Sequence, residues 1–380
     1  MSRAPLEREF LQTDVTRWVI GPFHSALPGP MRLHLDLDGE VVLGAEVERG
    51  FAHKGLEKTL EKRTWTQGIP VAARLDSEGS AFGELAYVLA VESLAEIEVP
   101  LRAQGIRVVI SELARISANL SFLGRMGRRV GADTLFHYVF RDREKILDLF
   151  ELLAGARHSL GFLRFGGVAA EVTDGLIERV IDFCDLLQVR FKEYNDLFSF
   201  SQALIGRTAH VGVLSAAHVR GHGVTGPNAR GAGVFLDARK QSPYSGYQQL
   251  DFDVSLGRGE LGQLGDVHDR LIVRIRDIVS SIQILRQVCE SMPDGAYHSG
   301  ISPLAFTVPA GEGYSRVESA RGLISCHVVS EGGSYPARVS FRTPSLSAIH
   351  VLPSILVGAR LEDLPVVLQS LDISVAEADR

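Results

Sequence analysis

The stretch IRVVISELARISANLSFLGRM, residues 106–126, decides the fold of this chain. Its apolar residues recur every three or four positions, which is the period of a helix that is buried in a protein core. The same period returns on both sides of this stretch, in the runs 53–67, 83–97, 143–163, 175–200 and 267–292. We therefore predict a core made of long helices that pack against one another.

Residues near both ends of the chain follow a two-residue period instead. Leu33, Leu35 and Leu37 alternate with polar residues up to Asp38-Gly39, and the alternation resumes at Val41. This pattern predicts a β-hairpin. Short strand-like runs return after about residue 312, and two helical runs follow them, so that the predicted elements are strands at 315–319, 323–330 and 337–341 and helices at 344–358 and 362–372.

The predicted fold class is α+β, in three regions that form one integrated domain. Residues 1–50 form an N-terminal β-region, residues 51–311 form the helical core, and residues 312–380 form a C-terminal β-element with the terminal helices. Residues 200–265 are richer in glycine than the rest of the core, and we expect several loops there.

The composition argues against several classes of function. Forty basic residues stand against forty-six acidic ones with no block of like charge, so no nucleic acid partner is expected. The three cysteines, Cys184, Cys289 and Cys326, are far apart in the sequence, which disfavours a disulfide framework or a four-thiolate metal site. We see no signal peptide, and charges interrupt the apolar stretches before the length of about 18 residues that a membrane span needs.

Two glycine patterns match the Gly-x-Gly-x-x-Gly fingerprint, at Gly221, Gly223 and Gly226 and again at Gly257, Gly259 and Gly262. A dinucleotide site needs a strand before these glycines and a helix that starts on them. Neither match has that context, and we do not expect PNARGAG, which follows the first match, to open a regular helix. The sequence therefore predicts no nucleotide site.

His218 and His222 have the spacing that places two imidazoles on one helix face. A zinc-protease helix carries a glutamate after the first histidine, and this chain has Val219 there. We expect these histidines to lie at the surface or to support other site residues from behind, and we predict no metal site in this chain.

The chain resembles the D subunits of complex I, the NADH-quinone oxidoreductases, a family related to the large subunits of nickel-iron hydrogenases. The resemblance rests on GPFHS…MRLHLDLDGE, FAHKGLEKTLEKRTWTQ, ARLDSEGSAFGELAYVLAVESL and VPLRAQGIRVVISELARISANL, in that order. It continues through FRDREKILDLFELLAGAR, GVLSAAHVRGHGVTGPNARGAGVFLDARKQSPYSGY and RTPSLSAIHVLP to a tail with Glu377, Asp379 and Arg380.

The resemblance implies a fold and a place. The fold would be a long-helix bundle of the hydrogenase-large-subunit type with small β-regions at the N- and C-terminal ends. The place would be the peripheral arm of a membrane complex, on the cytoplasmic side of the inner (plasma) membrane. The implied partners are a B-like iron–sulfur subunit, a C-like protein of the same arm and an H-like membrane subunit.

The implied function is that of a quinone-chamber subunit in an enzyme of the NADH dehydrogenase type, a translocase of the electron-transport chain. Electrons would pass from a [4Fe–4S] cluster in the neighbouring subunit to quinone as substrate, coupled to ion translocation. No redox centre is expected in this chain. Nickel-iron hydrogenases hold their metals through two Cys-x-x-Cys pairs, and the matching positions here, Arg74-Leu75-Asp76-Ser77 and the stretch 372–380, contain no thiol.

Three positions of the family's quinone site differ in this chain. The family loop reads Gly-Pro-Gln-His-Pro with a second histidine after it, and that histidine and a tyrosine after Arg-Leu-Asp bind the quinone headgroup. His24 matches the first histidine, but Pro28 stands at the second, Ser77 at the tyrosine, and Arg129 at an aspartate that pairs with the missing histidine. These four residues are the candidates for a quinone chamber, and we expect His24 to anchor its loop.

Three interpretations follow from these differences. The chain could still bind quinone, with His24, Ser77 or another group as the donor. It could serve a hydrogenase-related or complex I-like membrane complex with another acceptor. It could also be a catalytically silent scaffold, which would have the same fold without an open chamber.

Other matched positions point to a partner's cluster and to the core. His53, Lys54 and Arg74 match residues near the terminal iron–sulfur cluster of the family, where a positive charge stabilises the reduced cluster. An ion pair with Asp76 or Glu78 is the alternative role for Arg74.

Structural ion pairs are expected for Arg102, Arg107, Glu112 and Arg115, and contacts between elements or subunits for Asp237, Arg239, Lys240, Asp266, Asp269 and Arg270.

Overall fold

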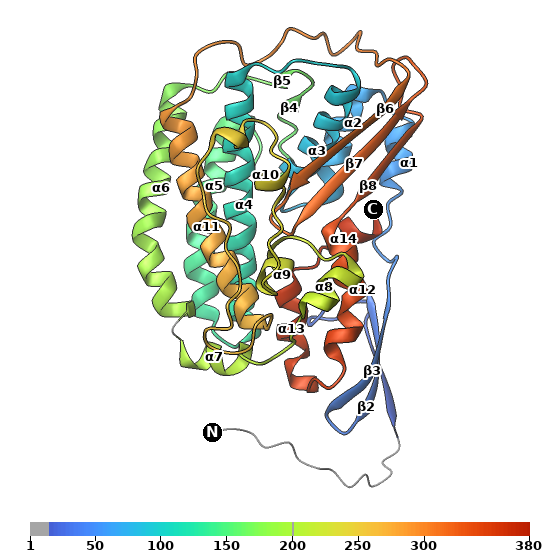
Figure 1. Cartoon of the computed structure of the whole chain (residues 1–380), viewed down its shortest axis with the longest axis vertical. Coiled ribbons are helices and arrows are strands. Elements are labelled where there is room, and N and C mark those ends of the chain that lie inside the picture. The colour runs from blue at the N-terminus through green and yellow to red at the C-terminus, as the bar shows by residue number, and fades with distance from the viewer. Residues whose placement is uncertain (1–14, 200) are drawn as a thin grey trace.

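Long helices stand side by side in one half of the computed structural model, which describes residues 15–199 and 201–380 (Figure 1). Helix α4 packs against both α5 and α11, and α6 packs against α5 and α11. The bounds are α4 (Leu101–Arg129), α5 (Asp133–Ala154), α6 (Asp174–Tyr194) and α11 (Val267–Glu290). The predicted bundle of long helices is confirmed.

Helix α4 is the centre of this bundle. Nearly all of its residues from Ala103 to Gly127 are buried, including the charged Glu112 and Arg115. A helix that is buried on every side needs partners for its polar groups, so its ion pairs belong to the core. Near its C-terminal end, a Cβ atom added at Gly124 would lie 2.7 Å from the ring of Phe140. The absence of a side chain there lets α5 approach closely.

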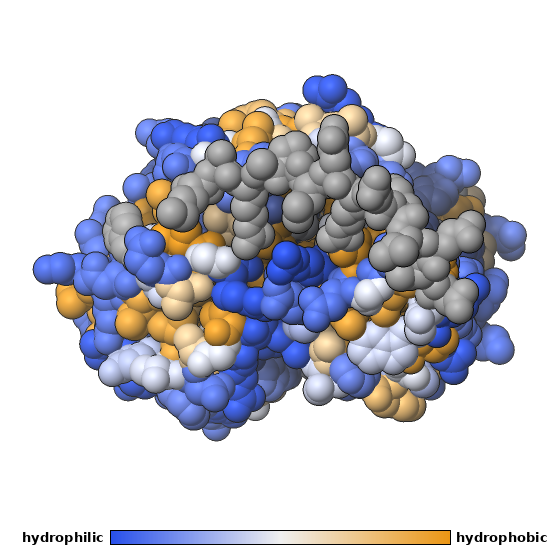
Figure 2. Space-filling view, turned by 90° about the horizontal axis from the view of Figure 1, so that it is seen from below, coloured by the Kyte–Doolittle hydropathy of each residue, from blue (hydrophilic) through white to orange (hydrophobic). Residues whose placement is uncertain are grey.

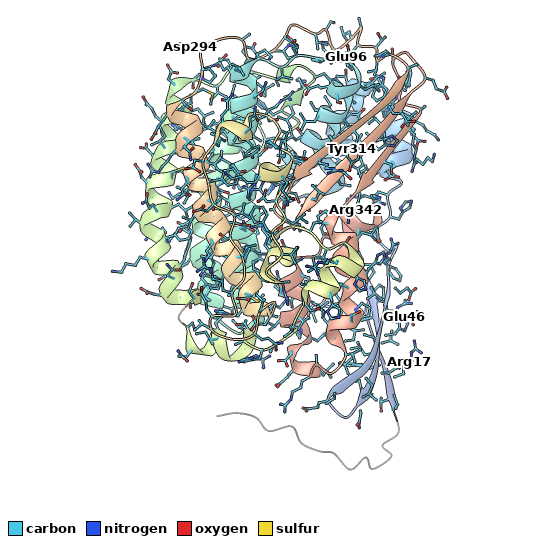
Figure 3. All side chains as sticks on the ribbon, viewed as in Figure 1. Arg17, Glu46, Glu96, Asp294, Tyr314 and Arg342 are labelled. Carbon is cyan, nitrogen blue, oxygen red and sulfur yellow. The ribbon has the colours of Figure 1, made fainter. Side chains whose placement is uncertain are left out.

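The C-terminal sheet packs on the other half of the molecule. Its strands β6 (Gly311–Glu318), β7 (Leu323–Ser330) and β8 (Arg338–Arg342) are antiparallel and adjacent in sequence order. The buried helix α3 (Ser80–Leu94) packs against β6, β7 and α4, and therefore joins this sheet to the bundle (Figure 1). Figure 3 shows Tyr314 and Arg342 on this sheet, and Arg342 donates a hydrogen bond of 2.8 Å to the carbonyl of Gly223.

The N-terminal hairpin is present as predicted, with an additional strand. Strand β2 (Arg32–Asp38) buries Leu33, Leu35 and Leu37, and β3 (Val41–Glu48) pairs with it across the turn at Gly39. Strand β1 (Thr16–Ile20), which we did not predict, pairs with β2 on the other edge. Figure 3 shows Arg17 and Glu46 on this sheet, and their side chains form an ion pair of 3.2 Å.

Short elements fill the glycine-rich region and the junctions between the larger parts. They are α1 (Leu56–Glu61), α2 (Trp65–Ala72), η1 (Ala73–Leu75), β4 (Leu163–Arg164), β5 (Gly167–Val168), a π-helical turn (Asn195–Ser199), α7 (Gln202–Thr208), α8 (Ala216–His222), α9 (Gly226–Gly231), α10 (Ala238–Gln241), η3 (Tyr247–Gln249) and η4 (Leu361–Asp363). Within the described residues, no helix is both long enough and apolar enough to cross a membrane.

The structure corrects three of the predictions about helices. The single run predicted at 53–67 is divided, because Thr64 caps α2 through a capping box with Gln67. The run predicted at 143–163 ends at Ala154, where Gly155 adopts a left-handed conformation (φ 70°). The stretch PNARGAG does take part in a short helix, α9, which begins at Gly226. Residues 1–14 of the predicted N-terminal region, and residue 200 of the run 175–200, lie outside the described residues.

Packing explains one glycine in each of the two fingerprint matches. Gly226 has φ of 66°, and a Cβ atom there would lie 2.3 Å from the backbone of Gly322. A Cβ atom at Gly257 would lie 2.1 Å from the carbonyl oxygen of Gly231. Helix α8, and not a strand, precedes the first match. Gly226 and Gly257 allow close backbone contacts, so these two glycines need no phosphate to explain them.

The C-terminal segment returns to the N-terminal part of the chain. Helices α12 (Pro344–Leu356), α13 (Leu364–Leu371) and α14 (Val375–Asp379) follow the C-terminal sheet. The carboxylate of Asp379 accepts hydrogen bonds from the backbone of Gly50 (2.9 Å) and of Ala52 (3.0 Å). The segment that leads from β3 to α1 is thereby held against α14.

On the lower face, apolar patches lie on both sides of a hydrophilic centre (Figure 2).

Candidate functional site

A cavity of about 320 Å³ lies where distant parts of the chain meet. The N-terminal loop, the turn between η1 and α3, the C-terminal end of α4, the turn after β6 and the segment from α13 to α14 all contribute to it. Its lining residues are Leu27, Pro28, Gly29, Pro30, Ala52, Asp76, Ser77, Glu78, Arg125, Arg129, Arg321, Leu368, Gln369, Asp372, Ile373, Ser374, Val375 and Ala376.

Three of the four candidates for the quinone chamber line this cavity together. Pro28 comes from the N-terminal loop, Ser77 from the turn before α3, and Arg129 from the last residue of α4. His24 is not part of the lining. It is exposed, and its Nδ1 accepts a hydrogen bond of 3.2 Å from the backbone of Ala26.

The wall behind the cavity is a network of buried ion pairs centred on Arg321. Its guanidinium contacts the carboxylates of Asp76, Glu78 (2.9 Å) and Asp372 (3.5 Å). Arg125 contacts Glu78 from the α4 side and also lies 3.2 Å from Asp372. The two arginines therefore hold three carboxylates from two separate chain segments in fixed positions.

This network sets the protonation of its carboxylates. Burial acts to raise the pKa of Glu78, but Arg125 and Arg321 outweigh it and lower that pKa to about 2. Burial raises the pKa of Asp76 despite the nearby guanidinium of Arg321. Glu78 is therefore ionised at neutral pH, while the neutral form of Asp76 is favoured more than in water.

A buried carboxyl group lies directly behind the lining. Glu377 is fully buried, and its Oε1 accepts a hydrogen bond of 3.1 Å from the backbone of Ser345, while Oε2 has no hydrogen-bond partner among the described residues. Burial, followed by the repulsion of Asp76, raises the pKa of Glu377 to about 8. Glu377 is therefore expected to hold a proton at neutral pH.

We expect Glu377→Gln to flatten the pH dependence of stability. Because the folded-state pKa of about 8 lies above the ordinary value of 4.5, the folded chain holds a proton that the unfolded chain releases between these values. The stability of the unsubstituted chain should therefore fall as the pH rises through this window. Glutamine cannot ionise, so the variant should gain on the order of a few kcal/mol relative to the unsubstituted chain between about pH 5 and about pH 8. Urea unfolding midpoints at several pH values measure this, and parallel curves would contradict it.

The three residues predicted to lie near a partner's cluster form a neighbouring surface. His53, Lys54 and Arg74 are all exposed. The Lys54 Nζ donates a hydrogen bond of 3.1 Å to the carbonyl of Arg74, and the Arg74 guanidinium donates one of 2.5 Å to the carbonyl of Pro70. This surface adjoins the cavity, because Ala52 and Asp76 of the same two segments line it.

The alternative role for Arg74 is wrong. Arg74 forms no ion pair with a carboxylate in the described part of the chain, since Asp76 and Glu78 are both paired with Arg321. The predicted structural ion pairs are present, and two of the three lie in the core, while that of Arg102 reaches the surface. Arg107 pairs with Glu92 (2.6 Å), Arg115 with Glu112 (3.2 Å), and Arg102 with Glu171 (2.7 Å).

The residues expected to link elements do so within this chain. Arg239 pairs with Asp237 (2.7 Å) and with Glu112 of α4 (3.3 Å). Asp266 caps α11, and Arg270 donates hydrogen bonds to the carbonyls of Gly265 (2.6 Å) and Gly212 (2.9 Å). These ion pairs and hydrogen bonds connect the glycine-rich loops to the helix bundle.

The histidine pair in α8 has no third metal-ligating side chain beside it in the part of the chain that the structure describes. His222 is bonded through Nδ1 to the carbonyl of His218 (3.1 Å), and in the described residues no group of three or more histidine, cysteine, aspartate or glutamate side chains is placed to hold a metal ion. His218 and His222 are both partly exposed.

Sequence reasoning did not find Arg125, Arg321, Asp372 and Gln369 in this site. They come from separate segments, and no local spacing links them. The position of Asp372 directly after α13, in a left-handed conformation (φ 49°), is visible only in the folded chain. An arginine in the turn between two predicted strands, at Arg321, is the one signal that the sequence offers.

Comparisons with known proteins agree on one family. The family model of the respiratory-chain NADH dehydrogenase 49 kDa subunit matches residues 129–305 and 298–380. The chain is 40% identical over 360 residues to the NADH-quinone oxidoreductase D subunit of Desulforamulus reducens, and the match covers 95% of this chain and 97% of that protein. It is 36% identical over 386 residues to the corresponding D 1 subunit of Opitutus terrae, with 95% and 89% covered. It is also 37% identical over 377 residues to the F420H2 dehydrogenase D subunit of Methanosarcina mazei, with 98% and 100% covered.

Proposed function

Because the chain belongs to the family of respiratory-chain NADH dehydrogenase 49 kDa subunits, we propose that it forms one wall of a chamber in which a membrane complex reduces a quinone-type acceptor. The redox centre that delivers the electrons is a [4Fe–4S] cluster in a neighbouring iron–sulfur subunit. The energy of the reaction drives ion translocation by membrane subunits.

The observation that carries this proposal is the shared cavity of Pro28, Ser77 and Arg129. The resemblance named these positions independently of the structure, and they belong to segments that are far apart in the sequence. A scaffold without turnover would have no need for an open chamber at this point. The cavity therefore favours acceptor binding over the scaffold.

The adjoining surface supports the position of a partner's cluster beside the cavity. Lys54 and Arg74 present two positive charges beside the cavity and have no carboxylate partner in the described part of the chain. Such charges stabilise the reduced form of a nearby cluster and raise its potential. We propose that the iron–sulfur subunit docks on this surface, where His53 donates its Nδ1 hydrogen bond to the carbonyl of Asp379 (2.7 Å).

The electron donor belongs to other subunits of the complex. The names of the relatives include both NADH and F420H2 as donors, and either would deliver electrons to the same cluster. We propose that the chain lies in the peripheral arm, on the cytoplasmic side of the membrane, between B-like, C-like and H-like partner subunits.

Ser77→Trp tests the proposal. Ser77 is an exposed residue of the cavity lining, and an indole ring there would fill much of a space of about 320 Å³. We expect quinone reduction by the purified complex to fall at least about tenfold, which is about 1.4 kcal/mol in the barrier, because the headgroup can no longer enter. Reduction of a water-soluble artificial acceptor should stay unchanged.

Ser302→Trp is the matched control, since Ser302 is also exposed but does not line the cavity. It should leave both activities unchanged. Normal quinone reduction by the Ser77→Trp complex would rule out this cavity as the acceptor site. A complex that reduces other carriers but no quinone, before any substitution, would rule out the proposed reaction.

A further inference from the structure

Two polar side chains in the cavity lining have no partner in the described part of the chain. Gln369 is only 7% exposed, and its carboxamide makes no hydrogen bond, although its backbone carbonyl accepts one from Asp372. Arg129 is half-buried, and its guanidinium forms neither an ion pair nor a hydrogen bond. Neither group is completely enclosed by protein, so both donors remain available to form hydrogen bonds with a ligand in the cavity.

No carboxylate in the described part of the chain neutralises the positive charge of Arg129. The three carboxylates of the lining, Asp76, Glu78 and Asp372, are already paired with Arg321 and Arg125. The charged neighbour that acts on Arg129 is Arg125, and burial together with this repulsion lowers the pKa of Arg129. A guanidinium remains charged at neutral pH even so, and in a half-buried site it favours a negatively charged ligand.

The remaining walls suit a flat ring. Leu27, Pro28 and Leu368 contribute apolar side chains, which contain no hydrogen-bond donor or acceptor. A ligand that fits all of these groups has an apolar planar body and oxygen acceptors at one edge. The planar guanidinium can bind two such oxygens side by side.

We infer that Arg129 and Gln369 together bind an ionised oxygen beside a carbonyl group, so that this cavity prefers an acceptor headgroup that carries a negative charge, of the acidic hydroxyquinone class, over a neutral quinone of the same shape. The inference rests on the proposed function, since it takes the cavity to be the acceptor site. It assigns the substrate class through two residues of this chain.

A matched pair of ligands tests the preference directly. Lawsone is an acidic hydroxynaphthoquinone that is ionised at neutral pH, and its methyl ether is a neutral quinone of nearly the same shape. We expect the oxidised, assembled complex to bind lawsone about tenfold more tightly than the ether in equilibrium dialysis, which corresponds to about 1.4 kcal/mol. No electron donor is needed for this measurement.

Substitutions assign the preference to the two residues. Arg129→Met should remove the preference, because the charge is lost, while Arg129→Lys should keep part of it. Gln369→Leu should weaken lawsone binding more than ether binding. Arg128→Met is the matched control, since Arg128 is the adjacent arginine but pairs with Asp133 (3.4 Å) and is not part of the lining. It should bind both ligands like the unsubstituted complex.

The outcomes separate the inference from the proposed function. Equal binding of the two quinones by the unsubstituted complex, or a preference that survives Arg129→Met, would overturn the inference and leave the acceptor site standing. Binding of neither quinone would overturn both. Lawsone binding that persists in the Ser77→Trp complex would place the ligand elsewhere and overturn the inference.

Discussion

Glu112→Leu is expected to destabilise the chain by about 3–5 kcal/mol, the range found when one partner of a buried charge pair is removed. Glu112 is completely buried in α4. Its carboxylate accepts hydrogen bonds from Arg115 (3.2 Å), Arg239 (3.3 Å), Tyr247 (2.6 Å) and Ser281 (2.6 Å). These groups belong to four different parts of the chain, so this one side chain connects the bundle to the glycine-rich region.

The cost arises from the cations that would be left behind. Burial acts to raise the pKa of Glu112, but Arg115 and Arg239 outweigh it and lower that pKa. Without the carboxylate, Arg115 would keep, among the described residues, the carbonyls of Glu318 (2.7 Å) and Ser319 (2.9 Å) as hydrogen-bond acceptors and the ring of Phe82 as a cation–π partner, none of which is an anion. Leucine supplies no acceptor, and an uncompensated buried charge costs more than the lost hydrogen bonds alone.

Urea unfolding of the purified chain, followed by near-ultraviolet circular dichroism, measures the effect. Glu112→Gln should be less damaging, since it keeps one acceptor oxygen. Glu312→Leu is the control, because the Glu312 side chain is 70% exposed and its one ion-pair partner among the described residues is His327 (3.1 Å). That substitution should change stability by less than about 1 kcal/mol. A Glu112→Leu midpoint equal to that of the control would refute this account of the core.

Arg321→Met is expected to have an effect of similar size, about 3–5 kcal/mol at neutral pH, and to disturb the cavity as well. Arg321 is 6% exposed and contacts Asp76, Glu78 and Asp372. Its Nε also donates a hydrogen bond of 2.9 Å to the carbonyl of Asp372. Among the described residues, removing it leaves Glu78 with Arg125, leaves Asp372 with Arg125 and the buried Arg274 (3.3 Å), and leaves Asp76 without an ion-pair partner.

The stability lost in the Arg321→Met chain should depend on pH in a defined direction. The folded-state pKa of Glu78, about 2, lies below its ordinary value of 4.5, so its contribution to stability is present above about pH 4.5 and is lost as the pH falls toward 2. Without Arg321 the pKa values of Glu78 and Asp76 rise. The Arg321→Met chain should therefore be weakest, relative to the unsubstituted chain, above about pH 5, and the difference should shrink on acidification as these carboxyl groups take up protons.

Arg157→Met is the matched control for charge. Arg157 also lies close to three carboxylates, those of Glu144, Asp148 (2.9 Å) and Glu151 (3.9 Å), but its side chain is 39% exposed. It should change stability by less than about 1 kcal/mol with little dependence on pH. Equal losses in the two variants would mean that burial does not control the strength of these pairs.

Much of the helical core could be predicted from periodicity, because its helices are long. The stretch 106–126 lies inside α4, and the run 267–292 matches α11 within two residues. Periodicity could not show where α1 ends and α2 begins, since both sides of Thr64 keep the same spacing of apolar residues. It also could not reveal β4 and β5, which are two residues long each and pair with each other, while Gly167 of β5 also bridges to the distant His298.

The candidate site could be predicted only in part, for a physical reason. Pro28, Ser77 and Arg129 were found through their place in a family pattern, which is a property of the linear sequence. The partners of the charged wall depend on which distant segments meet. Asp76 and Arg321 are 245 positions apart, and nothing in their flanking residues specifies the pairing. The free carboxamide of Gln369 is recognisable only after all of its neighbours are in place.

The same long-range pairing governs when the cavity can exist during synthesis. Arg321, Gln369 and Asp372 leave the ribosome after the helices of the bundle, so a nascent chain with a complete bundle still lacks the wall that faces Ser77. Until those residues have emerged, Glu78 has Arg125 as its ion-pair partner among the described residues, and Asp76 lacks the arginine that it pairs with in the folded chain. The pocket is thus a late product of maturation, and a partner that docks there recognises only finished chains.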